Sequence, residues 1–391
     1  SYNVAEVVQS GWTPTFTTLT PVNVAGSADP TDMAIADINT DGNLDALIVV
    51  PGSKAVVRMI NDGTGVFTRM SLTTPVNVGG QPVAIAVGDF DGLNGPDFAT
   101  ANLNGNSISI RLNDGSGVFS AAASISFALN SDPRVVSAGR FSTNNDADLD
   151  LFASLALDNR WEVHANDGSG SFSPNINATT AFVDFARDSI VADFDGDTRD
   201  DVAVVYANTD NVEIEFGGPT GLGSGTTPFQ RVDVGDIPAG IAVADFDGNG
   251  QMDFVTANKN SLDVTVVLNQ GGAIFDAGVA YSAGLSPVHV ATGDFNRDGS
   301  PDIAVANRDG NTVSLVMNRG NGTFAAPIPF GVGTGPETVG VADINGDGVD
   351  DLLVVNKTAR TLSALVNAGN QTVNVGTGQS LTVDIGNRQF Q

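Results

Sequence analysis

The chain has 391 residues, 41% of them hydrophobic and 16% charged, so it has enough apolar side chains for a packed core and does not resemble a disordered polymer. Its 45 acidic residues against 17 basic ones give a formal net charge of −28, which argues against nucleic acid because such binding needs Lys and Arg. With no cysteine and no apolar run near the roughly 18–20 residues of a membrane span, neither thiol chemistry nor membrane insertion is expected.

The first informative element in chain order is the nine-residue stretch Asp37–Asp45. It has oxygen-bearing side chains at positions 1, 3, 5 and 9 and a glycine, Gly42, at position 6. Ca²⁺ takes about six to eight oxygen ligands, and alternate residues of a tightly wound loop converge on one ion. The ligands predicted here are Asp37, Asn39, Asp41, Asp45 and the peptide carbonyl of Asn43.

The same loop recurs with first residues at 37, 89, 140, 193, 245, 294 and 343. The copy at 89 is weaker because Leu93 stands at position 5, and the copy from Arg140 to Asp150 is longer and has Arg in place of the first Asp. We therefore predict about five structural Ca²⁺ ions and allow a sixth; Asp/Asn-Gly turns without an ion are the alternative. The predicted ligands of the later copies, with the carbonyl used at position 7, are Asp89, Asp91, Asp97; Asp193, Asp195, Asp197, Arg199, Asp201; Asp245, Asp247, Asn249, Gln251, Asp253; Asp294, Asn296, Asp298, Ser300, Asp302; and Asp343, Asn345, Asp347, Val349, Asp351.

The segments around each loop repeat as well and predict four short strands per unit. A strand of small and β-branched residues such as Ile241–Ala244 precedes the loop, and an apolar strand such as Ala46–Val50 follows it. An alternating strand such as Val313–Met317 comes third, and the last strand begins at the Phe of segments such as Asn113–Phe119. Seven such units without a helical pattern predict an all-β fold, a seven-bladed β-propeller of four-stranded antiparallel blades with calcium loops.

The residue after the first position of each loop is always Ile or Phe, and we assign it to the contact between blades. These residues are Ile38, Phe90, Phe141, Phe194, Phe246, Phe295 and Ile344. Because the third unit keeps this residue, that blade is expected to form without its ion.

The two ends of the chain predict how the ring closes. The seventh unit lacks the Phe of the last strand, and Phe16 stands at the corresponding distance before the first loop, so residues 15–24 are predicted as the outer strand of the last blade. The predicted parts are an extension, 1–10, the propeller, 11–370, and a hairpin tail, 371–391. The two end segments either pad the closing blade or pair with another subunit.

Together, the Asp-x-Asp/Asn-x-Asp/Asn-Gly-x-x-Asp loops and the Asn-x-Gly-x-Gly-x-Phe segments resemble the FG-GAP/VCBS repeat family. Its members include the propeller of integrin α-subunits, some fungal and bacterial lectins and many secreted bacterial proteins. The resemblance covers about residues 11–370 and implies a seven-bladed ring with Ca²⁺ held on one face. It implies ligand roles for Asp37, Asn39, Asp41 and Asp45 and for their equivalents in the fourth to seventh units; Thr198 replaces the turn glycine in the fourth.

Three functions are compatible with this sequence. The first is a secreted or cell-surface binding and adhesion module for an extracellular glycan or protein, without enzymatic activity. Trp161, Tyr206 and Tyr281 are its candidate contact residues, with packing inside the blades as the alternative. The acidic loops favour the extracellular space, where Ca²⁺ is abundant, and the start at Ser1 is taken as a mature form after removal of a leader.

The second function is a self-assembling subunit of an extracellular fibre or surface layer, which would use the two end segments to pair with copies of itself. The third is a polysaccharide-degrading enzyme on a propeller. For that function only His164 and His289 are available as histidine bases, and neither lies near a Ser or Cys nucleophile motif.

Overall fold

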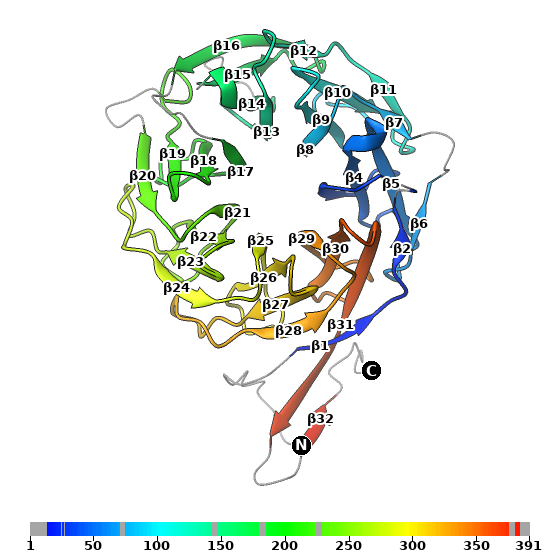
Figure 1. The fold of residues 1–391 in the computed structure, drawn as a ribbon, viewed down its shortest axis with the longest axis vertical. Helices are drawn as coiled ribbons and strands as arrows, with labels where there is room; N and C mark the ends of the chain where they lie inside the picture. Colours follow the sequence, from blue (N-terminus) through cyan, green and yellow to red (C-terminus); the bar gives the residue numbers. More distant parts are fainter. Residues whose placement is uncertain are drawn as a thin grey trace, which may run out of the picture.

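The structure is a computed structural model that describes residues 14–24, 26, 28–70, 75–141, 148–158, 160–179, 185–223, 229–374 and 380–383. Seven antiparallel sheets stand around a central axis, each with one strand near the axis and its last strand at the rim (Figure 1). The predicted seven-bladed all-β propeller of four-stranded blades is therefore confirmed. Within the described residues, no helix is long and apolar enough to cross a membrane.

The blades follow one another along the chain, and in three of them the rim strand is split into two short pieces. The first blade holds β3 (Asp32–Ala36), β4 (Asp45–Val50), β5 (Ala55–Asn61), β6 (Phe67–Arg69) and β7 (Val76–Asn77). The second holds β8 (Pro82–Gly88), β9 (Asp97–Asn102), β10 (Ser107–Asn113), β11 (Phe119–Ala121) and β12 (Ile125–Ser126). The third holds β13 (Pro133–Gly139), β14 (Asp150–Leu155), β15 (Arg160–Asn166) and β16 (Phe172–Thr179).

The remaining blades repeat this order. The fourth holds β17 (Ala186–Ala192), β18 (Asp201–Tyr206), β19 (Asn211–Glu215) and β20 (Phe229–Asp233); the fifth holds β21 (Pro238–Ala244), β22 (Asp253–Asn258), β23 (Asp263–Val267) and β24 (Val279–Ser282). The sixth holds β25 (Pro287–Gly293), β26 (Asp302–Asn307), β27 (Thr312–Val316) and β28 (Ile328–Gly331). The seventh holds β29 (Pro336–Ala342), β30 (Asp351–Asn356) and β31 (Thr361–Asn374); short 3-10 turns, η1 (Pro51–Ser53) and η2 (Ala156–Asp158), follow β4 and β14.

The seventh sheet takes strands from both ends of the chain. Its outer strand is β1 (Pro14–Thr18), which pairs antiparallel with β31. The next strand along the chain, β2 (Val22–Asn23), also pairs antiparallel with β31. Phe16 lies opposite Asn367, as Phe67 lies opposite Asn61 in the first blade, so the N-terminal strand occupies the register of a rim strand. Beyond the blade, β31 continues to pair with β32 (Ser380–Val383), and Figure 1 shows this ribbon standing off the ring.

The hydrophobic core is divided among the seven contacts between neighbouring blades. Each buried cluster joins residues of two adjacent blades, and each contains the large residue at position 2 of a loop. These residues are no more than 2% exposed: Ile38, Phe90, Phe141, Phe194, Phe246, Phe295 and Ile344. Because each blade packs only on its neighbours, the ring is held by the sum of seven similar interfaces.

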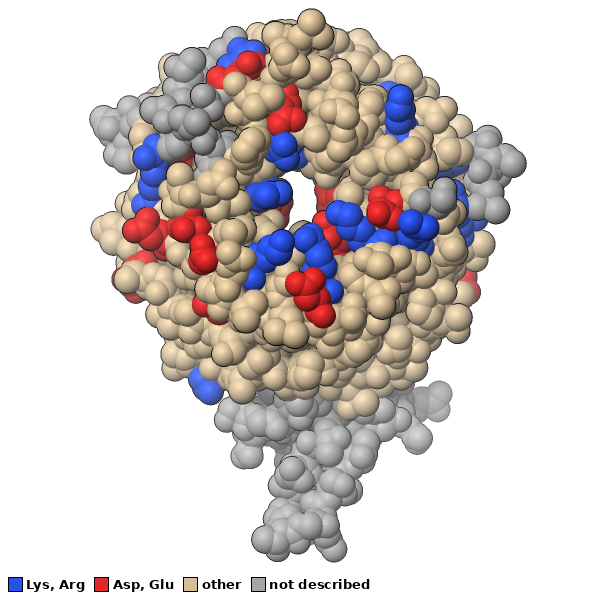
Figure 2. All heavy atoms as spheres, viewed as in Figure 1, with Lys and Arg blue, Asp and Glu red and all other residues tan. Residues whose placement is uncertain are grey.

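The two faces of the ring carry different connections. The acidic loops join the first and second strands of each blade at one face, and the turns between the second and third strands lie at the other. Figure 2 shows Lys and Arg side chains gathered around the central opening on one face, although the whole chain is strongly acidic.

Candidate metal centres

The aspartate at position 1 stabilises the tight conformation of each complete loop by accepting two backbone N–H groups. In the first blade, Asp37 accepts backbone N–H groups from Asp41 at 3.2 Å and from Gly42 at 2.9 Å. Asp193, Asp245, Asp294 and Asp343 accept the equivalent pair of N–H groups in their loops. The residue at position 6 has positive φ, which glycine adopts without strain, so the winding follows from the sequence.

Three loops bring carboxylates together closely enough to share a cation. Their ligand oxygens lie within 4.8 Å of one another in the sets Asp89, Asp91, Asp97; Asp193, Asp195, Asp197; and Asp245, Asp247, Asp253. An all-oxygen, carboxylate-rich donor set is what Ca²⁺ requires, so the residues fit this ion. The loop at 89 belongs to this group although Leu93, which is exposed, replaces its position 5 ligand.

The other complete loops have asparagine at position 3. Its amide nitrogen donates to the position 5 aspartate, at 2.9 Å from Asn39 to Asp41 and 3.0 Å from Asn296 to Asp298, and Asn345 repeats the pattern. The position 7 residues donate their backbone N–H to the position 5 side chain; these are Asn43, Arg199, Gln251, Ser300 and Val349. Their carbonyls as ligands remain a prediction.

The aspartate at position 9 is the most deeply buried acidic residue of each loop. Asp302 accepts N–H groups from Asn318 at 2.8 Å and Phe295 at 3.3 Å, and its side chain has no exposed surface. Burial, and then repulsion from Asp298 and Asp294, raises the pKa of Asp302 to about 8. The equivalent pKa values rise for the same leading reason, to about 6 for Asp45, Asp97 and Asp253 and about 7 for Asp201 and Asp351. A cation in the loop would offset this cost of holding several negative charges together.

A further functional side chain, which was not predicted from the sequence, is the asparagine at or just beyond the end of the third strand. Asn318 donates its backbone N–H to Asp302, and its amide donates to the carbonyl of Phe246 in the preceding blade at 2.9 Å. The loop of one blade is thereby tied to the loop of its neighbour. The same bond to the preceding blade is made by Asn61, Asn113, Asn166, Asn269 and Asn367. This asparagine opens the Asn-x-Gly-x-Gly-x-Phe segment, and its recurrence was the available signal.

The fourth blade makes this tie differently. Gly217 stands where the asparagine is expected, and it donates only its backbone N–H to Asp201, at 2.6 Å. The neighbouring carbonyl of Phe141 accepts instead from the backbone N–H of Leu222, at 3.3 Å. Thr198 holds the position 6 conformation with φ of +72°, a region that β-branched residues rarely adopt, so this loop is strained at a position where the other complete loops have glycine.

The third blade keeps the tie and loses the acidic loop. Asp150 accepts N–H groups from Phe141 and Asn166, each at 2.9 Å, so the closing aspartate is retained. Arg140 replaces the first aspartate, and its backbone N–H donates to Asp200 of the fourth blade at 2.7 Å. The loop interior, 142–147, lies outside the described residues.

The candidate ligand-contact aromatic residues pack within the ring. Trp161 and Tyr206 are buried between the third and fourth blades, and the indole N–H of Trp161 donates to Glu215 at 2.9 Å. Tyr281 is half-buried and lies edge-on to Phe324, with 5.2 Å between ring centroids. These three residues therefore pack inside the blades, which was the alternative to a role in ligand contact.

The two histidines lie far from each other in the ring. Burial lowers the pKa of His289 on the inner strand β25 to about 4. His164 lies on β15, 2.9 Å from Glu162. Within the described residues, neither histidine is bonded to a Ser hydroxyl, so the arrangement required for an acylating nucleophile is absent there.

Comparisons with known proteins agree with the fold and the repeats. Residues 193–256, 245–305 and 294–354 each match the FG-GAP-like repeat. No curated protein matches the sequence at a significant level. Among solved structures, virginiamycin B lyase from Staphylococcus aureus is similar at 10% identity and a TM-score of 0.61, with 90% of this chain and 99% of the lyase covered. BBS1N, solved in complex with ARL6DN, is similar at 11% identity and a TM-score of 0.62, with 92% and 98% covered. At these identities the likeness concerns the fold alone.

Proposed function

We propose that this chain, a seven-bladed propeller of FG-GAP-like repeats, is a calcium-stabilised module that binds a glycan or protein ligand outside the cell. The observation that carries the proposal is the convergence of carboxylate oxygens, within 4.8 Å, at the same place in separate blades. Such repetition is typical of a structural role, because a catalytic centre needs only one copy.

Calcium would act here by joining strands. Each ion would be held by one loop, whose position 9 aspartate begins the second strand of the blade, as Asp253 begins β22. That aspartate also accepts from the next strand, through Asn269 at 2.6 Å. An ion in the loop would therefore fix the first three strands of a blade relative to one another. Such loops fill best where Ca²⁺ is near millimolar, which supports a site of action outside the cell.

Binding is favoured over catalysis by the chemistry of the remaining surface. The acidic side chains of the loops accept hydrogen bonds from backbone N–H groups. The two histidines have no nucleophile as a hydrogen-bond partner among the described residues. A propeller presents two broad faces formed by the loops of successive blades, which suit recognition of an extended ligand. The solved neighbours include a lyase and a domain bound to a partner protein, so an enzyme assay belongs among the tests.

The proposal is tested by calcium titration and by ligand arrays. Isothermal titration should give about five or six Ca²⁺ per chain, and excess EGTA should lower the melting temperature substantially because binding stabilises only the folded state. The calcium-loaded protein should then bind members of a glycan or extracellular-protein array without consuming them. An unchanged melting curve in EGTA contradicts the calcium role, and turnover of a polysaccharide contradicts the non-enzymatic one.

A second function is favoured by one observation, the ribbon of β31 and β32. Its strands pair from Gln371 with Val383 to Asn374 with Ser380, past the part of β31 that belongs to the blade. Two-stranded ribbons have little stability alone, so pairing with a copy of the chain would stabilise it. This is the self-assembling subunit of a fibre or surface layer. Electron microscopy of the full chain should then show polymers, and a chain without 1–10 and 371–391 should remain single rings.

A further inference from the structure

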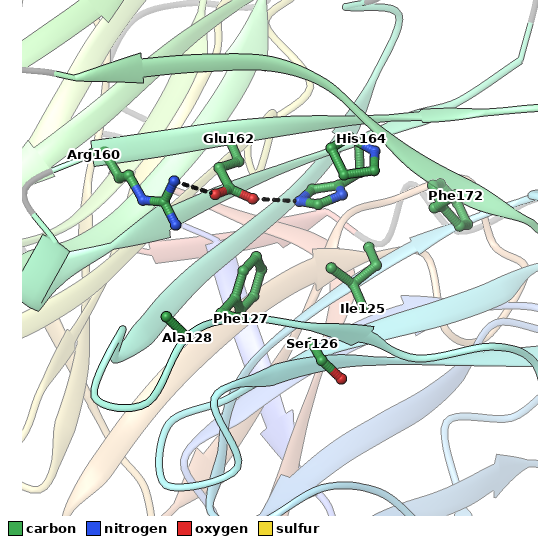
Figure 3. Close-up of a pocket in the computed structure, with 9 residues that line it drawn as sticks. Ile125, Ser126, Phe127, Ala128, Arg160, Glu162, His164 and Phe172 are labelled. Atoms are coloured by element: carbon green, nitrogen blue, oxygen red, sulfur yellow. Dashed lines mark hydrogen bonds and ion pairs between the residues drawn. The ribbon is translucent and has the colours of Figure 1, made fainter.

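A cavity of about 390 Å³ opens between the rim of the second blade and the third blade (Figure 3). One wall is the end of the second blade, around β12, and the other is formed by β15 and β16. Its lining residues are Ile125, Ser126, Phe127, Ala128, Arg160, Glu162, His164, Phe172 and Pro174. Its volume is in the range of small-molecule sites, roughly 300–1,000 Å³.

In the second, fifth and sixth blades, a hydroxyl residue on the third strand bonds the segment that leads in from the preceding blade. The hydroxyl of Ser109 accepts the N–H of Gly79 at 3.0 Å, and that of Thr265 accepts the N–H of Gly235 at 3.2 Å. In the sixth blade, the hydroxyl of Ser314 donates to the carbonyl of Ala283 at 3.1 Å. The strand register places Glu162 at this position in the third blade, because each of these residues pairs with the residue three places after the closing aspartate of its blade.

Glu162 instead bonds to its neighbours on the same strand. With Arg160 and His164 it forms a row of polar side chains along β15, which we call the polar row. One carboxylate oxygen lies 2.7 Å from Arg160 and the other 2.9 Å from Nε2 of His164. Glu162 is 5% exposed and His164 is 2% exposed, so both are buried at the cavity wall. Among the described residues, Nδ1 of His164 has no hydrogen-bond partner. Burying such a row costs more than burying Ser or Thr, which indicates that it is kept for a ligand.

The opposite wall departs from the repeat as well. The backbone N–H of Phe127 donates to the turn carbonyl of Asn106, a bond made at the same place in other blades by valine. The equivalent valines are Val24, Val78, Val234 and Val332. The Phe127 ring is half-buried and lies edge-on to His164, with 5.7 Å between ring centroids. Compared with the equivalent valines of the described blades, a large aromatic ring thus replaces a smaller side chain on the side that faces the polar row.

We propose that this cavity binds a neutral pyranose unit of a glycan. The inference rests on the proposed binding function and names its site and ligand class. A pyranose has a C–H face that packs on an aromatic ring such as Phe127, and vicinal hydroxyls that exchange hydrogen bonds with a paired carboxylate and guanidinium. Asp158 lies 3.6 Å from Arg160, so the row of Asp158, Arg160 and Glu162 carries excess negative charge, which disfavours acidic sugars.

The inference is tested with the full, calcium-loaded chain and defined probes. Saturation-transfer NMR with the methyl glycosides of glucose, galactose, mannose and fucose should show ring protons of at least one sugar in contact with the protein. Methyl glucuronide should show weaker transfer than methyl glucoside. Absence of transfer to all four neutral glycosides overturns the inference, as does a preference for the glucuronide.

Two variants locate the site. Phe127→Val restores the residue found at four equivalent positions, so it should fold normally, and it should weaken binding about tenfold. Glu162→Gln should weaken binding by about tenfold or more because it removes the acceptor charge. Val332→Ala, at the equivalent position of the sixth blade, is the matched control and should leave the dissociation constant unchanged.

The outcomes separate this inference from the proposed function. If the chain binds glycans and both variants bind as the wild type does, the site is wrong and the binding function stands. If the wild type binds no member of the glycan and protein arrays, the binding function itself fails. Melting temperatures of the variants, measured in the same buffer, establish that they are folded.

Discussion

Two groups of blades differ in how closely they follow the repeat. The fifth to seventh blades have every residue of the ion loop and the asparagine tie, and the third and fourth blades each lack one. In the regular group each loop has its first aspartate, its glycine at position 6 and its asparagine tie, as in Asp294, Gly299 and Asn318. In the other group Arg140 replaces the aspartate and Gly217 replaces the asparagine. The residues that match the FG-GAP-like repeat, 193–354, begin at the loop of the fourth blade and cover the regular ones.

The difference shows which parts of a unit are needed for closure of the ring. The irregular blades keep the buried residue at position 2 and the closing aspartate, as in Phe141 and Asp150, and they still form four strands. The third blade lacks the first aspartate of the ion loop, and the fourth lacks the asparagine of the tie. Their third strands carry buried acidic groups, among them Glu162 and Glu215, at positions where the regular blades have hydroxyl or apolar residues. Packing therefore defines a blade, while the loop chemistry can be exchanged.

The largest expected effect tests this claim directly. Phe246→Ala in the fifth blade and Phe141→Ala in the third should each lower the free energy of unfolding by about 3–5 kcal/mol, because both side chains are almost fully buried. Urea unfolding in calcium measures both. A much smaller cost for Phe141→Ala would mean that the third blade is not held by this contact.

The asparagine tie should have the next largest effect. Asn318→Ala removes the donor to the carbonyl of Phe246 and leaves buried polar groups unpaired, so it should cost about 2–3 kcal/mol. Asn321→Ala, in the exposed part of the same turn, is the control and should cost well under 1 kcal/mol. Equal effects in urea unfolding would show that the tie contributes nothing.

Calcium should distinguish the fifth blade from the third. Asp247→Asn in the fifth loop should reduce the calcium stoichiometry by one and, near 100-fold excess over Kd, remove about 2–3 kcal/mol of calcium-dependent stability. Asp148→Asn in the third blade, whose loop begins with Arg140, should leave the stoichiometry unchanged. Titration calorimetry and melting with and without EGTA measure both, and an equal loss in the two variants contradicts the assignment.

The smallest effect concerns pH and the fourth blade. Burial, and then repulsion from Glu213, raises the pKa of Glu215 to about 8. Because the folded state holds this proton more tightly than the unfolded one, stability from this group is lost as pH rises from about 4.5 through 8. Glu215→Gln still accepts the Trp161 N–H bond and should be about 1 kcal/mol more stable than wild type at pH 8, with no difference below about pH 4. The same difference at both pH values would contradict the titration.

The sequence predicted the features that recur at fixed spacing. Loop positions such as Asp245 and Asp253, the buried residue between them at position 2, and seven units of four strands are local patterns, so they are visible in one chain. The asparagine tie was missed because the partner of Asn318 is a carbonyl in another blade. The cavity at Glu162 was missed for a related reason: its walls come from different blades, and each wall alone reads as an ordinary strand.

Placing Phe16 opposite Asn367 sets a time order for folding. β1 is synthesised before all seven blades but belongs to the sheet that is completed last, so it has no partner strand until β31 has been made. Pairing segments so far apart in the chain is entropically costly. Once β1 is paired, the ring has no terminal blade with an unpaired edge at which unfolding could begin. We expect such a molecule to mature slowly and then to unfold slowly.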